Sequence, residues 1–203
     1  MRHFIFDLDG TLIDTEKPVL MTWQQTLSED GFVFSLESLR AVLGIPLQDG
    51  LTRLEVQAKP DFANRWKQNY TRFAPEAQFF PGAEEMLSLL REKGYEIGVV
   101  SSRDRAEYTA FFSHFGLEKF VGTVILAEDT QRHKPDPEPL LAYMNATGAK
   151  PAECIYIGDM PGDILCANQA GVTSGLAAWS QSGIACPDAQ YIFHDVTEVL
   201  QLT

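Results

Sequence analysis

The 203-residue chain has little cysteine and few basic residues. Its three cysteines, Cys154, Cys166 and Cys186, are odd in number and form no C-x-x-C pair, which argues against a disulfide framework or a cysteine zinc site and suits a reducing compartment. Lys and Arg number 16 against 28 Asp and Glu, a formal net charge of −12. Such a surface repels nucleic-acid backbones and anionic membranes, so we expect neither as a partner. An anionic substrate would need positive charge supplied locally, by a metal ion or a few placed cations.

Long apolar runs are also missing. No run approaches the roughly 20 residues of a membrane span. Acidic residues follow the first apolar residues too soon for the apolar region of a signal peptide. With 45% hydrophobic and 22% charged residues, the composition is ordinary for a soluble globular protein. We expect a cytoplasmic monomer or homodimer, built as one domain with an insertion or as two small domains.

Short apolar runs that end in polar or glycine-bearing loops alternate with helical patterns. Runs apolar at nearly every position are typical of strands buried on both faces of a parallel sheet. They cover residues 4–6, 97–100, 123–126, 155–157 and, more weakly, 175–178. Helical periodicity covers residues 83–93, 136–147 and 162–170. This alternation predicts an α/β fold with a doubly wound parallel sheet.

One stretch breaks the alternation. Between about residue 16 and about residue 79 we find helical patterns and no convincing strand. These patterns cover residues 18–30, 36–43, 47–57 and 62–73. We interpret the stretch as an all-helical insertion after the first strand, and Pro81-Gly82 as the return to the sheet. The predicted domains are an α/β core of residues 1–14 and 81–203 and a helical domain of residues 15–80.

Asp7 and Asp9 directly follow the first predicted strand. A turn at Gly10 can bring both carboxylates to the carboxyl end of the strands, where open α/β sheets bind their ligands. Taken alone, an Asp-x-Asp pair at a strand end is more often a pair of solvated turn residues.

Two further sites could bind an anion. Ser101 and Ser102 follow the run at residues 97–100 and could offer hydroxyl and N–H groups to a phosphate oxygen, although turn formation is their commoner role. Arg103, next in the chain, would by default be a solvated side chain. Lys134 lies in a proline-rich segment that we expect to hold the chain extended before a helix, so that the ammonium can neutralise an anion.

A fourth site contains Asp159 at a strand end and Asp163 in the first turn of the next helix. Two carboxylates placed in this way can share a hard cation, and both positions also suit helix capping. The four sites occur in the order Asp-x-Asp, Ser, Lys, Asp…Asp, each at the end of an apolar run or just before a helix. In a parallel sheet they converge on one edge, and this combination is much more specific than any one site.

These residues give the chain a clear resemblance to the haloacid dehalogenase superfamily, in its phosphatase branch. Residues 6–14, Phe-Asp-Leu-Asp-Gly-Thr-Leu-Ile-Asp, are similar to the family's first motif. The second, third and fourth motifs are matched by Ser101, by Lys134-Pro135, and by Gly158-Asp159 with Asp163. The resemblance covers the whole chain, including the helical insertion, which looks like the family's four-helix type of cap.

The resemblance implies a role for each motif residue. Asp7 would be the nucleophile that forms an aspartyl-phosphate, and Asp9 the general acid and later the base. Mg²⁺ would be held by Asp7, the main-chain carbonyl of Asp9, and Asp159, with Asp163 in support. The phosphoryl oxygens would be held by Ser101, Ser102 and Lys134.

The carboxylate at Asp9 argues against dehalogenation, because dehalogenases of this superfamily lack it. Residues 43–47 and 80–82 look most like phosphoglycolate phosphatases and their pyrophosphatase relatives, whereas Asp14-Thr15-Glu16 is shared with β-phosphoglucomutases. We therefore expect a magnesium-dependent phosphatase for a small phosphorylated metabolite, with a phosphomutase or a pyrophosphatase as alternatives. A silent binding protein on this fold would lack a motif residue, and none is missing. The candidate cap residues for selecting the substrate are Gly44, Ile45, Pro46 and Arg53, although packing within the cap is the commoner role for each except Arg53.

Overall fold

The computed structural model describes residues 1–44, 47–180 and 186–203. The chain forms two compact units, one of Met1–Ile13 with Phe79–Thr203 and the other of Asp14–Gln78. These boundaries lie within two residues of those expected from the sequence. The candidate cap residues Ile45 and Pro46 fall outside the described residues.

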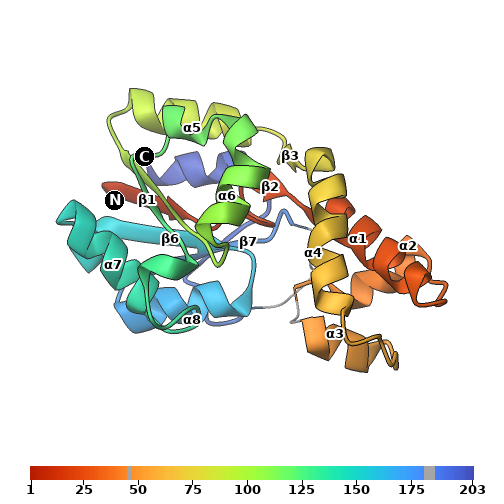
Figure 1. Ribbon diagram of the computed structural model, residues 1–203. Coiled ribbons are helices and arrows are strands. Elements are labelled where there is room, and N and C mark those ends of the chain that lie inside the picture. The colour runs from red at the N-terminus through yellow and green to blue at the C-terminus, as the bar shows by residue number, and fades with distance from the viewer. Residues whose placement is uncertain (45–46, 181–185) are drawn as a thin grey trace. The chain divides into compact units, whose positions relative to one another are not determined.

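Six parallel strands form the sheet of the first unit, in the order β5-β4-β1-β6-β7-β8 (Figure 1). They are β1 (His3–Phe6), β4 (Glu96–Val100), β5 (Thr123–Ile125), β6 (Cys154–Gly158), β7 (Thr173–Ala177) and β8 (Tyr191–Phe193). Every residue of β1 and of β6 is buried, as expected for apolar strands covered on both faces. Phe6 is in register with Val99 of β4 and with Ile157 of β6, so the carboxyl ends of these three strands lie at one level.

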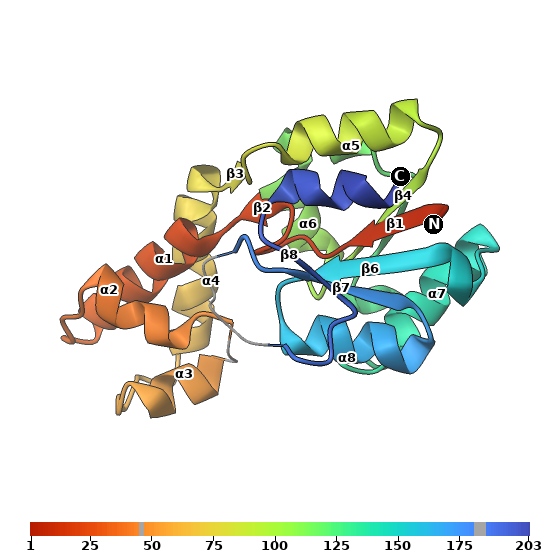
Figure 2. The ribbon, with the colours of Figure 1, turned by 180° about the vertical axis from the view of Figure 1, so that it is seen from behind.

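Helices cover both faces of this sheet. On one face lie α7 (Glu138–Thr147) and α8 (Pro161–Ala170), and on the other lie α5 (Ala83–Glu92) and the 3-10 helix η7 (Val196–Leu202) (Figures 1 and 2). The core beneath α7 and α8 includes Tyr143, Tyr156 and Cys166, all fully buried. The doubly wound α/β fold predicted from the sequence is confirmed.

The remaining elements of the first unit are short. They are α6 (Arg105–Phe112), η3 (Ser113–Phe115), η4 (Leu117–Lys119), η5 (Ala127–Asp129) and η6 (Pro151–Glu153). Two-residue strands β2 (Ile13–Asp14) and β3 (Gln78–Phe79) pair with each other where the chain passes from one unit to the other.

The second unit is helical between those strands. It contains α1 (Glu16–Glu29), α2 (Leu36–Leu39), η1 (Arg40–Val42), α3 (Leu47–Arg53), α4 (Phe62–Phe73) and η2 (Ala74–Glu76). Its apolar core gathers Leu20, Trp23 and Leu27 from α1 with residues of the other helices, among them Phe62 of α4. Helix α3 is shorter than the pattern at residues 47–57 predicted, because the backbone turns left-handed at Glu55 (φ 56°).

The sequence analysis did not predict β8 or α6 of the sheet unit. Strand β8 is the three-residue apolar run Tyr191–Phe193, which the sequence analysis did not single out, and its residues Tyr191 and Ile192 are exposed at the sheet edge. Helix α6 buries only Phe112, and its clearest sequence signal is the capping box of Asp104 and Glu107. Among the described residues, no helix is both long and apolar enough to cross a membrane.

Candidate active site

The predicted site residues lie at the carboxyl ends of the central strands. Asp7 follows β1, Ser101 follows β4 and Asp159 follows β6. From β1 the sheet grows through β4 and β5 to one side and through β6, β7 and β8 to the other. The order of the chain therefore reverses next to β1, and such switch points are where open α/β sheets bind ligands.

Three carboxylates meet at this point. One oxygen each of Asp7, Asp159 and Asp163 lies within 4.8 Å of the others, and the three residues are 7%, 7% and 1% exposed. Two glycines make the approach possible: a Cβ at Gly10, whose φ is +74°, would collide with the Asp159 carboxylate, and one at Gly158 would collide with Asp163. Oxygen donors grouped in this way could hold a metal ion.

Lys134 is the cation of this cluster. Its Nζ lies 2.9 Å from Oδ1 of Asp7 and 2.7 Å from Oδ1 of Asp163, and it donates a third bond of 3.1 Å to the Tyr156 hydroxyl. The expectation that the prolines hold this segment extended is wrong. Residues 133–136 form a turn, closed by the N–H of Asp136 donating to the carbonyl of His133, and this turn brings the ammonium inward.

Burial and mutual repulsion shift the protonation of the carboxylates. Burial, with smaller contributions from Asp163 and Asp9, raises the pKa of Asp7 to about 7, although Lys134 opposes the shift. Burial and the charges of Asp7 and Asp163 raise the pKa of Asp159 well above its usual range. Burial disfavours charged Lys134, but Asp163 and Asp7 outweigh that effect and raise its pKa. The cluster holds more negative charge than Lys134 neutralises, a condition that a bound cation would relieve.

Asp9 has a different partner. Its two carboxylate oxygens accept from Nη2 and Nε of Arg103, at 2.8 Å and 3.0 Å. Arg103 is thus no solvated side chain: it is 16% exposed, and its guanidinium lies over the ring of Phe112. The side chain of Asp9 belongs to this pair and not to the cluster of Asp7, Asp159 and Asp163.

The loop after β4 presents the two candidate serines. Ser101 is buried, and its hydroxyl accepts the N–H of Arg103 at 3.2 Å, so it keeps its own proton to donate elsewhere. Ser102 is exposed at the same turn.

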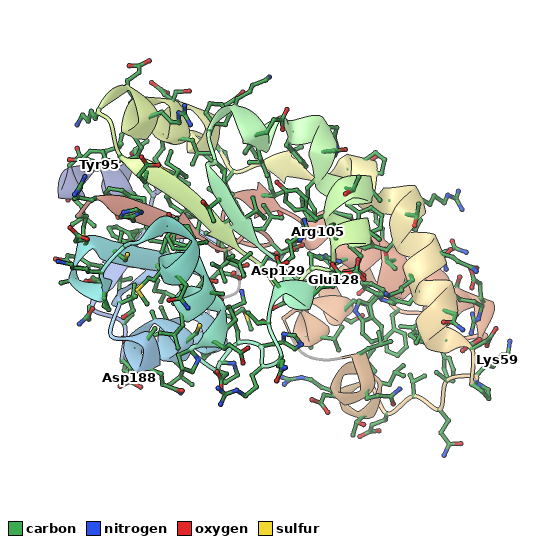
Figure 3. All side chains as sticks on the ribbon, turned by 60° about the vertical axis from the view of Figure 1, so that its left-hand side comes forward. Lys59, Tyr95, Arg105, Glu128, Asp129 and Asp188 are labelled. Carbon is green, nitrogen blue, oxygen red and sulfur yellow. The ribbon has the colours of Figure 1, made fainter. Side chains whose placement is uncertain are left out.

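Hydrogen bonds and ion pairs join the start of α6 to η5, the 3-10 helix after β5. Arg105 lies beside Glu128 and Asp129, with 2.9 Å between its Nη2 and Oδ1 of Asp129 (Figure 3). The N–H of Ala127 also donates to the carbonyl of Arg103 at 3.0 Å. These bonds fix the backbone on which Arg103 meets Asp9.

The sequence analysis missed three contributors to the site. Tyr156 was counted only as part of an apolar run, and Arg103 was given a solvated role. Trp179 donates its Nε1–H to the carbonyl of Thr11 at 3.0 Å, and the Thr11 hydroxyl donates to Asp159 at 3.3 Å. A tyrosine inside a buried strand was the one available signal, because a buried phenol needs a polar partner.

Two of the four candidate cap residues are described. Gly44 is exposed, with φ +70°, and Arg53 is exposed at the end of α3. Both lie in the second unit, and their part in any site remains a prediction.

Comparison with known proteins identifies the family to which the chain belongs. Residues 4–177 match the family of haloacid dehalogenase-like hydrolases. A pyrophosphatase, PpaX, of Halalkalibacterium halodurans is 28% identical over 98% of this chain and 94% of its own. A phosphoglycolate phosphatase of Xanthomonas campestris is 31% identical over 88% and 83%. A solved structure from Lactobacillus plantarum, provisionally assigned as a phosphoglycolate phosphatase, has a TM-score of 0.85 at 23% identity and covers 100% of this chain and 99% of its own. This chain belongs to the haloacid dehalogenase-like hydrolase family.

Proposed function

We propose that this protein is a magnesium-dependent phosphatase, which removes the phosphoryl group of a small metabolite through an aspartyl-phosphate on Asp7. The observation that carries the proposal is the buried cluster after β1, where Asp7 lies beside Lys134 and two further carboxylates. The similarity to a phosphoglycolate phosphatase and a pyrophosphatase supports it.

Mg²⁺ fits this cluster by charge and by donor type. Asp7, Asp159 and Asp163 bring three negative charges against the single positive charge of Lys134. Carboxylate and carbonyl oxygens are the ligands that hard cations take. Asp7, Asp159 and the main-chain carbonyl of Asp9 would hold the ion, with Asp163 in support. When bound, the ion would neutralise charge on the transferred phosphoryl group and keep Asp7 ionised.

The chemistry then divides between Asp7 and Asp9. A carboxylate oxygen of Asp7 bonds to phosphorus while the bond from phosphorus to the leaving oxygen breaks, and Asp9 gives that oxygen a proton. In the second step Asp9 takes a proton from water, the water oxygen bonds to phosphorus, and the bond from phosphorus to Asp7 breaks. Asp9 meets Arg103 through both oxygens, and each of these oxygens keeps a second lone pair on which the transferred proton could be held.

Lys134 and the serines would hold the phosphoryl oxygens. The three protons of Lys134 serve Asp7, Asp163 and Tyr156, so a phosphoryl oxygen must replace one of these partners. Asp7 is the partner to be replaced, because its carboxylate loses charge when it becomes an acyl phosphate. The hydroxyl of Ser101 and the exposed turn at Ser102 would bind the remaining oxygens.

The substrate we propose is a phosphoglycolate-like phosphomonoester, with pyrophosphate as the second candidate because a relative carries that name. Gly44, Ile45, Pro46 and Arg53 are the proposed selectors in the helical unit. The net charge of −12 favours small anions over nucleic acid or membranes. We propose that the protein works in the cytoplasm, as a monomer or a homodimer.

A screen of phosphorylated metabolites, ranked by kcat/KM, tests this function. It would include phosphoglycolate, pyrophosphate and p-nitrophenyl phosphate, each with Mg²⁺ and with a chelator, and Asp7→Asn would serve as the inactive control. We expect Mg²⁺-dependent release of orthophosphate. Absence of turnover on every substrate, or equal turnover by Asp7→Asn, would contradict the proposal.

A phosphomutase is the second candidate because Asp14-Thr15-Glu16 is shared with that group. Incubation with β-glucose 1-phosphate and a trace of the bisphosphate separates the two activities. Orthophosphate release without glucose 6-phosphate supports the proposed phosphatase activity, and production of glucose 6-phosphate would contradict it.

A further inference from the structure

Tyr156 makes contacts that its position in an apolar strand did not suggest. The residue is fully buried in β6, between Ile155 and Ile157. Its hydroxyl accepts a bond of 3.1 Å from Nζ of Lys134, and it lies 3.0 Å from the carbonyl of Val100 and 3.1 Å from Oδ1 of Asp163. The single hydroxyl proton serves one of these two acceptors at a time, while the oxygen accepts from Lys134.

The contact with Val100 crosses the central strand. In the sheet, β1 lies between β4 and β6, and its register with β4 ends at Phe6 and Val99. Beyond this last pair the N–H of Asp7 still donates to the carbonyl of Ile157 in β6. The Tyr156 hydroxyl lies 3.0 Å from the carbonyl of Val100, the residue of β4 that follows the last pair with β1. It thereby ties the end of β4, immediately before Ser101, to the elements that carry Lys134 and Asp163.

The contact with Lys134 differs in kind from the other two bonds of the ammonium. Asp7 and Asp163 are acidic partners, which can separate from Lys134 when a phosphoryl group or a metal ion binds. The phenol of Tyr156 is a neutral partner. A neutral hydroxyl can accept from Lys134 and donate its own proton at the same time.

We infer that Tyr156 is a positioning residue of the phosphoryl site: its hydroxyl holds Lys134 and the backbone before Ser101 in place while the carboxylate partners of Lys134 exchange. This inference rests on the proposed function in one respect only, that Lys134 and Ser101 hold a phosphoryl group. Tyr156 itself touches neither substrate nor metal in this scheme.

Tyr143 provides a matched control. It is also fully buried, in α7, and its hydroxyl lies 3.2 Å from Nδ1 of His3, at the opposite end of β1 from Asp7. Tyr143→Phe and Tyr156→Phe each delete one buried hydroxyl and keep the ring. A merely structural role would make the two variants alike, with lower unfolding temperatures and unchanged chemistry.

The test measures kcat and KM for p-nitrophenyl phosphate with Mg²⁺, and the Kd of orthovanadate with Mg²⁺ by calorimetry. For Tyr156→Phe we expect kcat to fall and the vanadate Kd to rise, each by about 10- to 100-fold, the range for a hydrogen bond to a charged group. We expect KM to change less than kcat. For Tyr143→Phe we expect both values within about twofold of the wild type, within the spread of substitutions remote from the site. Wild-type values in folded Tyr156→Phe would overturn the inference.

A double-mutant cycle shows whether Tyr156 acts through Lys134. If it does, Tyr156→Phe weakens vanadate binding little further in a Lys134→Ala background. If the losses in vanadate affinity of the two single variants multiply in the double variant, the inference is overturned. Should Tyr156→Phe not fold, Tyr156→Met lacks the hydroxyl too, packs flexibly, and carries the same test.

The binding measurement separates this inference from the proposed function. If the wild type binds vanadate but hydrolyses no substrate, the proposed function fails and the vanadate comparison still decides the role of Tyr156. If the wild type with Mg²⁺ binds no vanadate, Lys134 holds no phosphoryl group and the inference is wrong.

Discussion

Each unit of the molecule contains a cluster of three carboxylates around a cation, and the two clusters differ in electrostatic character. In the sheet unit Lys134 contacts Asp7 and Asp163, with Asp159 beside them. In the helical unit Arg65 contacts three acidic side chains. They are Glu29 at 2.8 Å, Asp30 at 2.6 Å and Asp61 at 3.1 Å.

In the helical cluster, cations and hydrogen-bond donors match the acidic side chains. Lys59 joins it as a second cation, 3.3 Å from Asp30, and its backbone N–H donates to the same carboxylate. These bonds, together with Arg65, outweigh the effect of burial and lower the pKa of Asp30. Hydrogen bonds from Gln25, Arg65 and Asn69 lower the pKa of Glu29 in spite of burial. The cluster favours the charged carboxylates that it contains, so it stabilises the fold.

The cluster in the sheet unit disfavours the charges that it contains, because the pKa of Asp7 and that of Asp159 are both raised. Keeping ionised groups in such surroundings costs folding free energy, and the cost persists only where something else is gained from it. Residue types alone do not separate the two clusters. The direction of the pKa shifts does, and it supports a structural role for Arg65 and the functional role proposed for Asp7.

The largest expected effect is on turnover. Asp7→Asn should lower Mg²⁺-dependent hydrolysis of p-nitrophenyl phosphate by at least about 10⁴-fold, because it removes the proposed nucleophile and leaves the proposed binding groups in place. Asp61→Asn, which changes a carboxylate of the helical cluster in the same way, should leave kcat within about twofold, because Asp61 has no part in the proposed chemistry. Circular dichroism checks that both variants are folded. Comparable losses in the two variants would remove the distinction between the clusters.

Removal of the cation is expected to have the next largest effect. Lys134→Ala should lower kcat/KM by about 10²–10³-fold through lost stabilisation of phosphoryl charge. Arg65→Ala should leave kcat/KM near the wild-type value and destabilise the fold by about 1–3 kcal/mol. Steady-state kinetics and urea unfolding of both variants measure the two effects. A mild kinetic effect of Lys134→Ala would place Lys134 outside the site.

The sequence predicted which residues gather at the site because a parallel sheet aligns strand ends. Asp7, Ser101 and Asp159 each end an apolar run, and those runs became β1, β4 and β6. The sequence did not predict which particular side chains pair with one another. Arg103 reaches Asp9 across 94 positions of the chain, and which rotamers meet depends on how two loops fold.

Tyr156 shows a second limit of sequence reasoning. In a buried strand the hydrophobic pattern hides a phenol among aliphatic neighbours, and the partners of its hydroxyl come from β4, α8 and the Lys134 turn. Strand β8 was missed although Tyr191–Phe193 is an apolar run, because a run of three residues, two of them exposed at a sheet edge, does not by itself distinguish a strand from a loop.

A smaller effect concerns stability without metal. Asp159→Asn removes one of three repelling carboxylates, so in the presence of a chelator it should raise the unfolding temperature by about 2–4 °C, which corresponds to about 1 kcal/mol. Asp30→Asn removes a carboxylate that its neighbours stabilise, and should lower the unfolding temperature by at least that amount. Differential scanning calorimetry on the metal-free variants gives both values. Two changes of the same sign would mean that the clusters do not differ.

The smallest effect is a dependence on pH that only the sheet-unit cluster should show. Since the pKa of Asp7 is raised to about 7, the folded metal-free protein holds a proton there that the unfolded chain has already released, from the ordinary carboxyl range near pH 4 up to about pH 7. Stability from this source is present at low pH and is lost as the pH rises through that window. Asp159 behaves in the same way, because burial and the charges of Asp7 and Asp163 raise its pKa well above the usual range, and Asp159→Asn removes this loss. The excess stability of Asp159→Asn over the wild type should be larger near about pH 8 than near about pH 6, and saturating Mg²⁺ should abolish it. For Asp30 the folded pKa is lowered, so its contribution to stability is lost only in more acidic solution. The stability deficit of Asp30→Asn should therefore be the same at both pH values.

Thermal melts of the three proteins at the two pH values, with and without Mg²⁺, measure the differences. A stability excess of Asp159→Asn that is the same at both pH values would contradict the electrostatic origin assigned to it.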